Sequence, residues 1–132
     1  MSLVDVYEVS RLFPFGDDQV RALDSVSLSL EAGEFTAMVG PSGSGKTTLL
    51  NQIGELDQPD SGRIVVDGTE ITSLGRAALT RLRLWKIGFV FQEYNLIAVL
   101  TARENVEYLM QLQGVAAAER RRRALFNTLC KE

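Results

Sequence analysis

The chain has 132 residues, 45% of them hydrophobic and 23% charged, with a formal net charge of -3. This balance is typical of a globular domain and excludes a disordered or fibrous chain. The single cysteine, Cys130, excludes an intramolecular disulfide, and the lack of histidine excludes Ser-His-Asp catalysis and zinc sites built on histidine. No apolar run is long enough to predict a transmembrane helix.

The N-terminal third is rich in strand patterns. Alternating apolar residues predict strands over 3–9 and 24–30, and proline, glycine and acidic residues predict a loop over 13–18. A short apolar run over 35–39 is typical of a strand buried on both faces. A glycine-rich loop over 40–45 follows, and the spacing after it predicts a helix over 47–55.

A β-branched run at 64–66 precedes Asp67-Gly68, and this combination predicts a β-hairpin. The same residues resemble the apolar run plus aspartate that holds Mg²⁺ in phosphoryl-transfer enzymes. The hairpin is the favoured interpretation, because Gly68 marks a turn and no second acidic residue follows Asp67 directly.

The remainder alternates between helix and strand patterns. Helical spacing covers 76–84, 102–112 and 116–129, with Gly114 between the last two helices, and a short buried strand is expected at 87–91. Strands come first and β-α alternation follows, which predicts an α/β fold with an antiparallel subsheet.

Residues 40–47 match the phosphate-loop pattern G-x-x-x-x-G-K-[ST] at every fixed position. Glycines let successive backbone N–H groups face anionic oxygens, Lys46 supplies a compact cation for the β- and γ-phosphates, and the Thr47 hydroxyl is a ligand suited to Mg²⁺. The alternative is an ordinary glycine-rich connection, and a Rossmann loop is excluded because no third glycine follows Gly45. The predicted phosphate-binding residues are Gly40, Pro41, Ser42, Gly43, Ser44, Gly45, Lys46 and Thr47.

Several further segments, in order along the chain, resemble the nucleotide-binding domain of ATP-binding cassette (ABC) transporters. They are residues 26–28, 31–34, 56–62 and 87–92, and residues 95–96 and 100–106 resemble the subgroup for lipoprotein release and macrolide export. The resemblance spans residue 3 to about 115. It implies an incomplete P-loop NTPase-like α/β domain over 1–132, with a nucleotide-binding core and its antiparallel subsheet over 3–91. Residues 92–132 would then hold the Q-loop and the start of a helical subdomain.

The resemblance also implies roles for three residues outside the loop pattern. Phe13 would stack on the adenine of ATP, Thr48 would steady the α-phosphate, and the Gln92 side-chain oxygen would complete the Mg²⁺ shell begun by Thr47. Each residue has a plainer interpretation as well. Phe13 suits packing at a sheet edge, Thr48 suits capping of its own helix, and Gln92 suits the end of a strand.

The segment Glu93–Thr101 resembles the surface that receives a helix of a transmembrane permease. Its apolar residues Leu96, Ile97, Val99 and Leu100 would be unusual on a free surface. The alternative is a buried loop of the same domain. The family pattern further implies a second ATPase domain as a partner, and a cytoplasmic location at the inner face of the cell membrane.

Four consecutive arginines, residues 120–123, have two interpretations. They suit a nucleic-acid or membrane contact, or the solvated face of an amphipathic helix. The negative net charge and the lack of interleaved aromatic residues favour the second interpretation. We therefore expect no nucleic-acid partner.

The motifs that complete catalysis in the resembled family are not found: the signature sequence, the apolar run ending in Asp-Glu, and the switch histidine. We expect the N-terminal portion of an ABC ATPase, which binds Mg-ATP but hydrolyses it only very slowly on its own. The alternatives are a non-catalytic nucleotide-binding module that regulates a partner, and a truncated remnant without function. In the family the strand with the Mg²⁺ aspartate lies between those of 35–39 and 87–91. Its absence should leave a gap or force those two strands to pair.

Overall fold

The computed structural model describes residues 2–129, with side chains described as far as residue 125. Cys130 lies outside the described residues. The chain forms two compact units, Met1–Thr80 and Arg81–Glu132. The predicted division into a core over 3–91 and a helical part over 92–132 stays a prediction. In the described residues, no helix combines the length and the apolar character that crossing a membrane requires.

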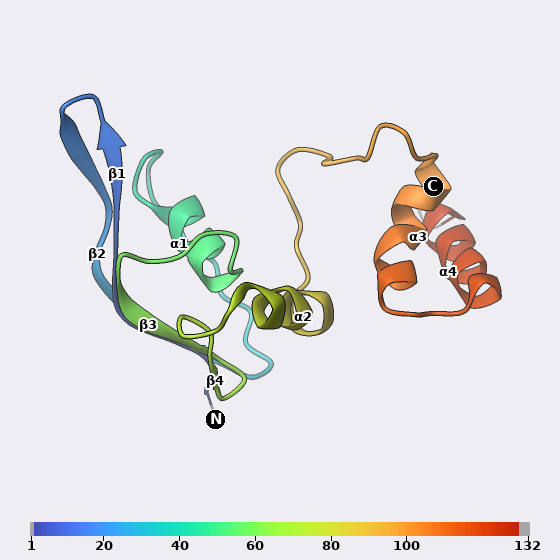
Figure 1. Cartoon of the computed structure of the whole chain (residues 1–132), viewed down its shortest axis with the longest axis horizontal. Helices are drawn as coiled ribbons and strands as arrows, with labels where there is room; N and C mark the ends of the chain where they lie inside the picture. The colour runs from blue at the N-terminus through green and yellow to red at the C-terminus, as the bar shows by residue number, and fades with distance from the viewer. Residues whose placement is uncertain (1, 130–132) are drawn as a thin grey trace. The chain divides into compact units, whose positions relative to one another are not determined.

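An antiparallel sheet of four strands organises the first unit, with the order β2-β1-β3-β4. Strands β1 (Ser2–Phe15) and β2 (Asp18–Glu31) form a long hairpin, seen in blue in Figure 1. The predicted loop over 13–18 is wrong, because Phe13 pairs with Val20 and only a two-residue turn remains. Gly16 has a φ of 62° there, a conformation that glycine adopts without steric cost, so the strands continue almost to the turn.

The second hairpin, β3 (Ser61–Val66) and β4 (Thr69–Glu70), confirms the prediction for that region. Asp67 and Gly68 have φ values of 48° and 73°, as the favoured two-residue hairpin turn requires. Asp67 also donates its backbone N–H to the Leu3 carbonyl oxygen, which ties this turn to β1.

The core of the first unit lies on one face of the sheet, against helix α1 (Lys46–Ile53). Val6, Val9 and Ile64 are almost completely buried, and burial of side chains of this size stabilises the fold by about 1.5–3 kcal/mol each. On β2 the predicted alternation is present, since residues 26, 28 and 30 are half-buried and the serines between them are exposed.

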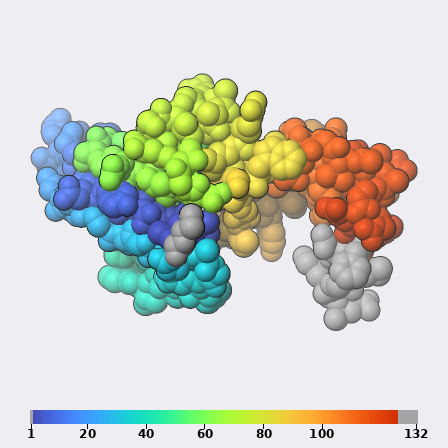
Figure 2. Space-filling view, turned by 90° about the horizontal axis from the view of Figure 1, so that it is seen from below, coloured from blue at the N-terminus to red at the C-terminus, as the bar shows by residue number. Residues whose placement is uncertain are grey.

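Two predicted strands do not form. Residues 35–39 are outside the sheet, with Phe35 97% and Val39 90% exposed, and Figure 2 shows this cyan segment at the surface. Residues 87–91 are likewise not a strand, Val90 is fully exposed, and the Phe89 and Phe91 rings stack at 5.5 Å. A strand needs a neighbour for its backbone groups, and local apolar character does not supply one.

The predicted helices are confirmed, with small shifts at their ends. They are α1 (Lys46–Ile53), α2 (Arg76–Lys86), α3 (Ala102–Leu112) and α4 (Ala117–Leu129). Gly114, at a φ of 77°, separates α3 from α4, which contact each other in the second unit. Buried Glu107 of α3 lies 3.6 Å from the Arg120 side chain of α4, so an ion pair joins the two helices.

Most of the arginine run takes part in ion pairs within the second unit. Arg120 pairs with Glu107, and both Arg122 and Arg123 pair with Glu119 at 2.7 Å. These contacts favour the interpretation of the run as the polar side of an amphipathic helix.

Candidate phosphate-binding site

The loop over 40–45 is seated against the β1–β2 hairpin. Gly43 and Gly45 have φ values of 80° and 87°, in the left-handed region that favours glycine. A Cβ at Gly45 would overlap the Ala22 carbonyl oxygen of β2 and press on Leu23. Glycine is therefore required at position 45 both by the backbone conformation and by the close approach to the sheet.

The Lys46 side chain lies across the loop. Its Nζ donates to the carbonyl oxygens of Gly40 and Pro41, each at 2.7 Å, and lies 3.0 Å from the Ser44 hydroxyl. A Cβ at Gly40 would lie 2.8 Å from that same hydroxyl oxygen. The Lys46 ammonium group therefore lies at the mouth of the loop, where its positive charge can attract an anion.

Helix α1 begins at the same place. Its N-cap is Gly45, so no side chain caps the first turn, and the first turn contains no acidic residue. The N-terminal N–H groups of a helix carry a partial positive charge and bind anions when no cap occupies them. Buried Leu49 anchors this short helix to the core, while Thr47 remains exposed beside the loop.

Phe13 belongs to the hairpin that supports the loop. It pairs with Val20, two residues before Ala22, and the residue is 37% exposed. The Arg11 guanidinium lies 4.7 Å from the centre of the Phe13 ring, a cation–π distance. The ring therefore has a fixed neighbour from its own strand and retains surface on which another flat group can stack.

Gln92 and the segment after it lie in the second unit. Gln92 is exposed, as are most residues of 93–101, with Val99 90% exposed. The alternative of a buried loop is therefore wrong. The large apolar side chains exposed in this segment are Tyr94, Leu96, Ile97 and Val99.

Asn105 holds this exposed segment in shape. Its Oδ1 accepts the Ile97 N–H at 2.8 Å, and its Nδ2 donates to carbonyl oxygens of Ile97, Leu100 and Thr101. Thr101 caps α3 through a reciprocal pair of bonds with Glu104. We missed both contacts from the sequence, although the Thr-x-x-Glu spacing at 101–104 is a signal for such a cap.

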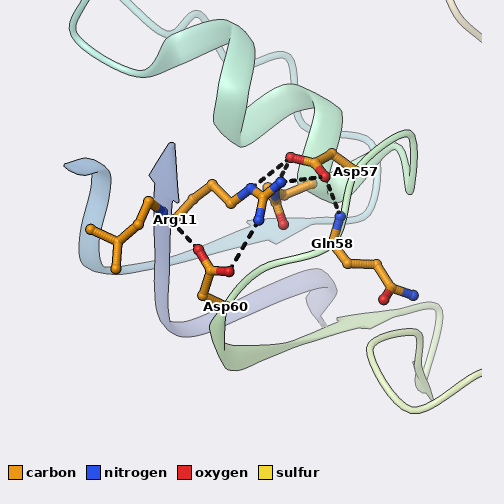
Figure 3. A network of polar contacts seen from close by, with 6 residues as sticks. Arg11, Asp57, Gln58 and Asp60 are labelled. Atoms are coloured by element: carbon orange, nitrogen blue, oxygen red, sulfur yellow. Dashed lines mark hydrogen bonds and ion pairs between the residues drawn. The ribbon is translucent and has the colours of Figure 1, made fainter. Parts of the chain in front are cut away.

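A network of polar contacts around Arg11 was also missed (Figure 3). Arg11 contacts Asp57 and Asp60, which follow α1. Each aspartate lies more than forty positions after Arg11 in the sequence. Ion pairs between a strand and a distant loop leave no periodic pattern, so the sequence offers no signal for them.

The oxygen atoms near the loop could hold a magnesium ion only together with the phosphates of a bound nucleotide. Among residues 2–129, no cluster of three or more His, Cys, Asp or Glu side chains is placed to hold a metal. Mg²⁺ is usually held by one or two protein oxygens together with waters and substrate phosphates, and the exposed Thr47 hydroxyl beside the loop fits that pattern.

A glycine-rich loop, a lysine across its mouth and an uncapped helix N-terminus together define the P-loop class of nucleotide-binding proteins. The family model described as ABC transporter matches residues 23–131. The chain belongs to the ABC transporter family.

Two relatives show the degree of similarity. The chain is 48% identical over 122 residues to the macrolide export ATP-binding/permease protein MacB of Hyphomonas neptunium, covering 92% of this chain and 19% of that protein. It is 48% identical over 124 residues to an uncharacterized ABC transporter ATP-binding protein of Thermotoga maritima, covering 94% and 52%. The chain thus spans about half the length of one relative and about a fifth of the other.

Solved structures agree with the family. The dimeric structure of MJ0796, described as a bacterial ABC transporter cassette, matches with a TM-score of 0.88 and 42% identity, over 92% of this chain and 54% of that one. A post-hydrolysis state of MJ0796 bound to ADP and Pi matches with the same TM-score and 43% identity. The fold is that of the N-terminal part of the ATP-binding cassette.

Proposed function

We propose that these residues bind Mg-ATP as the nucleotide-binding part of an ABC transporter ATPase. The observation that carries the proposal is the coincidence of the Lys46 ammonium with the uncapped N-terminus of α1. Both supply positive charge to one place beside N–H donors, which is the environment that nucleotide phosphates require.

Each site residue has a binding role in this proposal. The backbone N–H groups of residues 40–48 surround the phosphates, with Thr48 beside the α-phosphate, and Lys46 neutralises charge on the β- and γ-phosphates. Phe13 offers a ring to the adenine. The oxygens of Thr47 and Gln92 would hold Mg²⁺, which neutralises phosphate charge when bound.

These residues bind the nucleotide but do not supply the groups that ATP hydrolysis requires. The chain contains no histidine and no Asp-Glu run, and phosphoryl transfer to water depends on groups that position the water and stabilise charge. We expect only very slow ATP hydrolysis by this chain alone. Hydrolysis comparable to that of a complete cassette would overturn this part of the proposal.

The exposed apolar segment supports a partner. We propose that Glu93–Thr101 contacts a transmembrane permease at the cytoplasmic face of the membrane, and that a second ATPase domain completes the assembly. Leu96 and Val99 are exposed, while Asn105 fixes the backbone beneath them. A shaped apolar surface of this kind is typical of a protein–protein contact.

Calorimetric titration with Mg-ATP tests the nucleotide site. Lys46→Ala should abolish binding, because the variant removes the cation at the mouth of the loop. Lys86→Ala, at the end of α2, is the matched control and should bind as the wild type does. Unchanged affinity in Lys46→Ala would refute the proposal.

Site-specific cross-linking tests the permease contact. A photoreactive residue at Val99 should cross-link to a co-expressed ABC permease in membranes, while one at Val20, which is exposed on β2, should not. Equal cross-linking from both positions, or none from Val99, would contradict this part of the proposal.

A further inference from the structure

The Arg11 guanidinium makes three hydrogen bonds to the carboxylates of two aspartates, Asp57 and Asp60 (Figure 3). Its Nε and Nη2 donate to the two oxygens of Asp57 at 2.8 and 2.9 Å, and its Nη1 donates to Asp60 at 3.1 Å. The two-point contact with Asp57 uses the planar fork of the guanidinium, which fixes the group in orientation as well as position.

Both carboxylates are themselves held by other groups. Asp57 accepts from the Gln52 side chain of α1 at 3.1 Å and from the Gln58 N–H at 2.9 Å. Asp60 accepts from the Leu12 N–H at 2.7 Å. Gln52 is only 1% exposed, so this network reaches into the core beneath α1.

The fixed guanidinium lies over the ring of Phe13. The distance from the Arg11 guanidinium carbon to the ring centre is 4.7 Å, and Phe13 as a whole residue is 37% exposed. One side of the ring is therefore occupied by a cation that cannot move away without breaking its contacts with Asp57 and Asp60. A base can stack only on the surface that remains.

We propose that Arg11 is the positioning residue for the base of the bound nucleotide. It orients the Phe13 ring and, through Asp57 and Gln52, couples that ring to α1, whose N-terminus carries the phosphate loop. The inference rests on the proposed function, because it assumes that Phe13 receives the base. Its consequence is that Arg11 affects the base-dependent part of the affinity and leaves the phosphate-dependent part unchanged.

Two ligands separate these parts: Mg-ATP, and inorganic tripolyphosphate with Mg²⁺, which has no base. Phe13→Ala should weaken Mg-ATP binding about five- to a hundredfold, the range for loss of a base–aromatic stack. Arg11→Lys keeps the charge but cannot make the two-point contact with Asp57, and it should weaken Mg-ATP binding about two- to fivefold because the Phe13 ring loses its fixed neighbour. Neither variant should change the affinity for tripolyphosphate.

The chain offers a matched control. Arg63 lies 4.5 Å above the Tyr7 ring in the same sheet, so Arg63→Lys makes the same chemical change away from the loop and should change neither affinity. Asp60→Asn removes one charged partner of Arg11 but leaves the Asp57 contact, and it should weaken Mg-ATP binding less than Arg11→Lys does. In the double variant Arg11→Lys/Phe13→Ala, the affinity should equal that of Phe13→Ala alone.

The outcomes distinguish the inference from the function on which it rests. If Lys46→Ala binds Mg-ATP normally, the proposed function itself fails. If Phe13→Ala weakens Mg-ATP binding and Arg11→Lys does not, only the positioning role is overturned. If Arg11→Lys weakens tripolyphosphate binding as much as Mg-ATP binding, the residue serves the fold alone and the inference is again overturned. If Phe13→Ala has no effect on Mg-ATP binding, the ring is not a base platform and the inference falls with it.

Discussion

Gly45 lies against Ala22, so close that a Cβ on the glycine would overlap the carbonyl oxygen of the alanine. This contact seats the phosphate loop on the β1–β2 hairpin and sets the direction in which α1 leaves the loop. The hairpin also carries Phe13 and Arg11. One strand pair therefore supports both the proposed phosphate contacts and the proposed base contact.

The first prediction concerns this contact. Gly45→Ala should lower the free energy of unfolding more than Gly43→Ala does, as measured by urea denaturation. Both positions have positive φ, which costs an alanine about 1–2 kcal/mol, but only position 45 adds a clash with backbone. Equal losses in the two variants would show that the Ala22 contact does not constrain the loop.

The second prediction concerns the core of the sheet. Ile64 is completely buried on β3, and Ile64→Ala should lower the free energy of unfolding by about 2–5 kcal/mol, because lost burial and a residual cavity add. Val20→Ala, at a half-exposed position on β2, is the control and should cost much less. A small effect at position 64 would mean that the sheet closes up around the missing side chain.

The third prediction concerns the start of α3. Thr101→Ala removes the cap that accepts the Glu104 N–H, and should destabilise the helix by about 1 kcal/mol. Hydrogen exchange of the first-turn amides should accelerate accordingly. Thr101→Ser keeps a hydroxyl, so it should retain most of the protection; equal exchange in both variants would rule out a role for the side-chain cap.

The fourth prediction concerns pH. Hydrogen bonds from Arg122 and then Arg123 lower the pKa of Glu119 from 4.5 to about 2. A carboxylate with a lowered pKa in the folded state stabilises that state above its unfolded pKa, and the contribution is lost as the pH falls through the folded value. Helicity measured by circular dichroism should therefore fall between about pH 4.5 and pH 2 in the wild type. Glu119→Gln should remove this part of the pH dependence, and an unaltered profile would contradict it.

The fifth prediction separates a nucleotide-binding domain from a remnant without function. Thermal unfolding should be cooperative, and its midpoint should rise with Mg-ATP, since a ligand at a hundred times its Kd stabilises the folded state by about 2.7 kcal/mol. The same addition should leave the midpoint of Lys46→Ala unchanged. A broad unfolding transition whose midpoint does not change with Mg-ATP would favour a remnant without function.

Local signals predicted much of this protein. The phosphate-loop pattern at 40–47, the Asp67-Gly68 turn and the helical spacings depend on neighbours in sequence, and the structure has the turn and the helices where the sequence indicates them. The family followed from several motifs in register, and the family model confirms it. The features that the sequence did not predict depend on partners elsewhere in the fold, such as the contacts of Arg11 with Asp57 and Asp60.

The sequence by itself determined the family, the loop, the hairpin turn at 67–68 and the four helices, because propensities, turn residues and motif spacing act over a few positions. Tertiary structure decided the rest. Residues 35–39 and 87–91 are apolar enough for strands, yet they form none, since a strand exists only when another strand accepts its hydrogen bonds. The tertiary structure also brings Arg11, Asp57 and Asp60 together beside Phe13. Ion pairs between residues more than forty positions apart arise from the packing of α1 on the sheet.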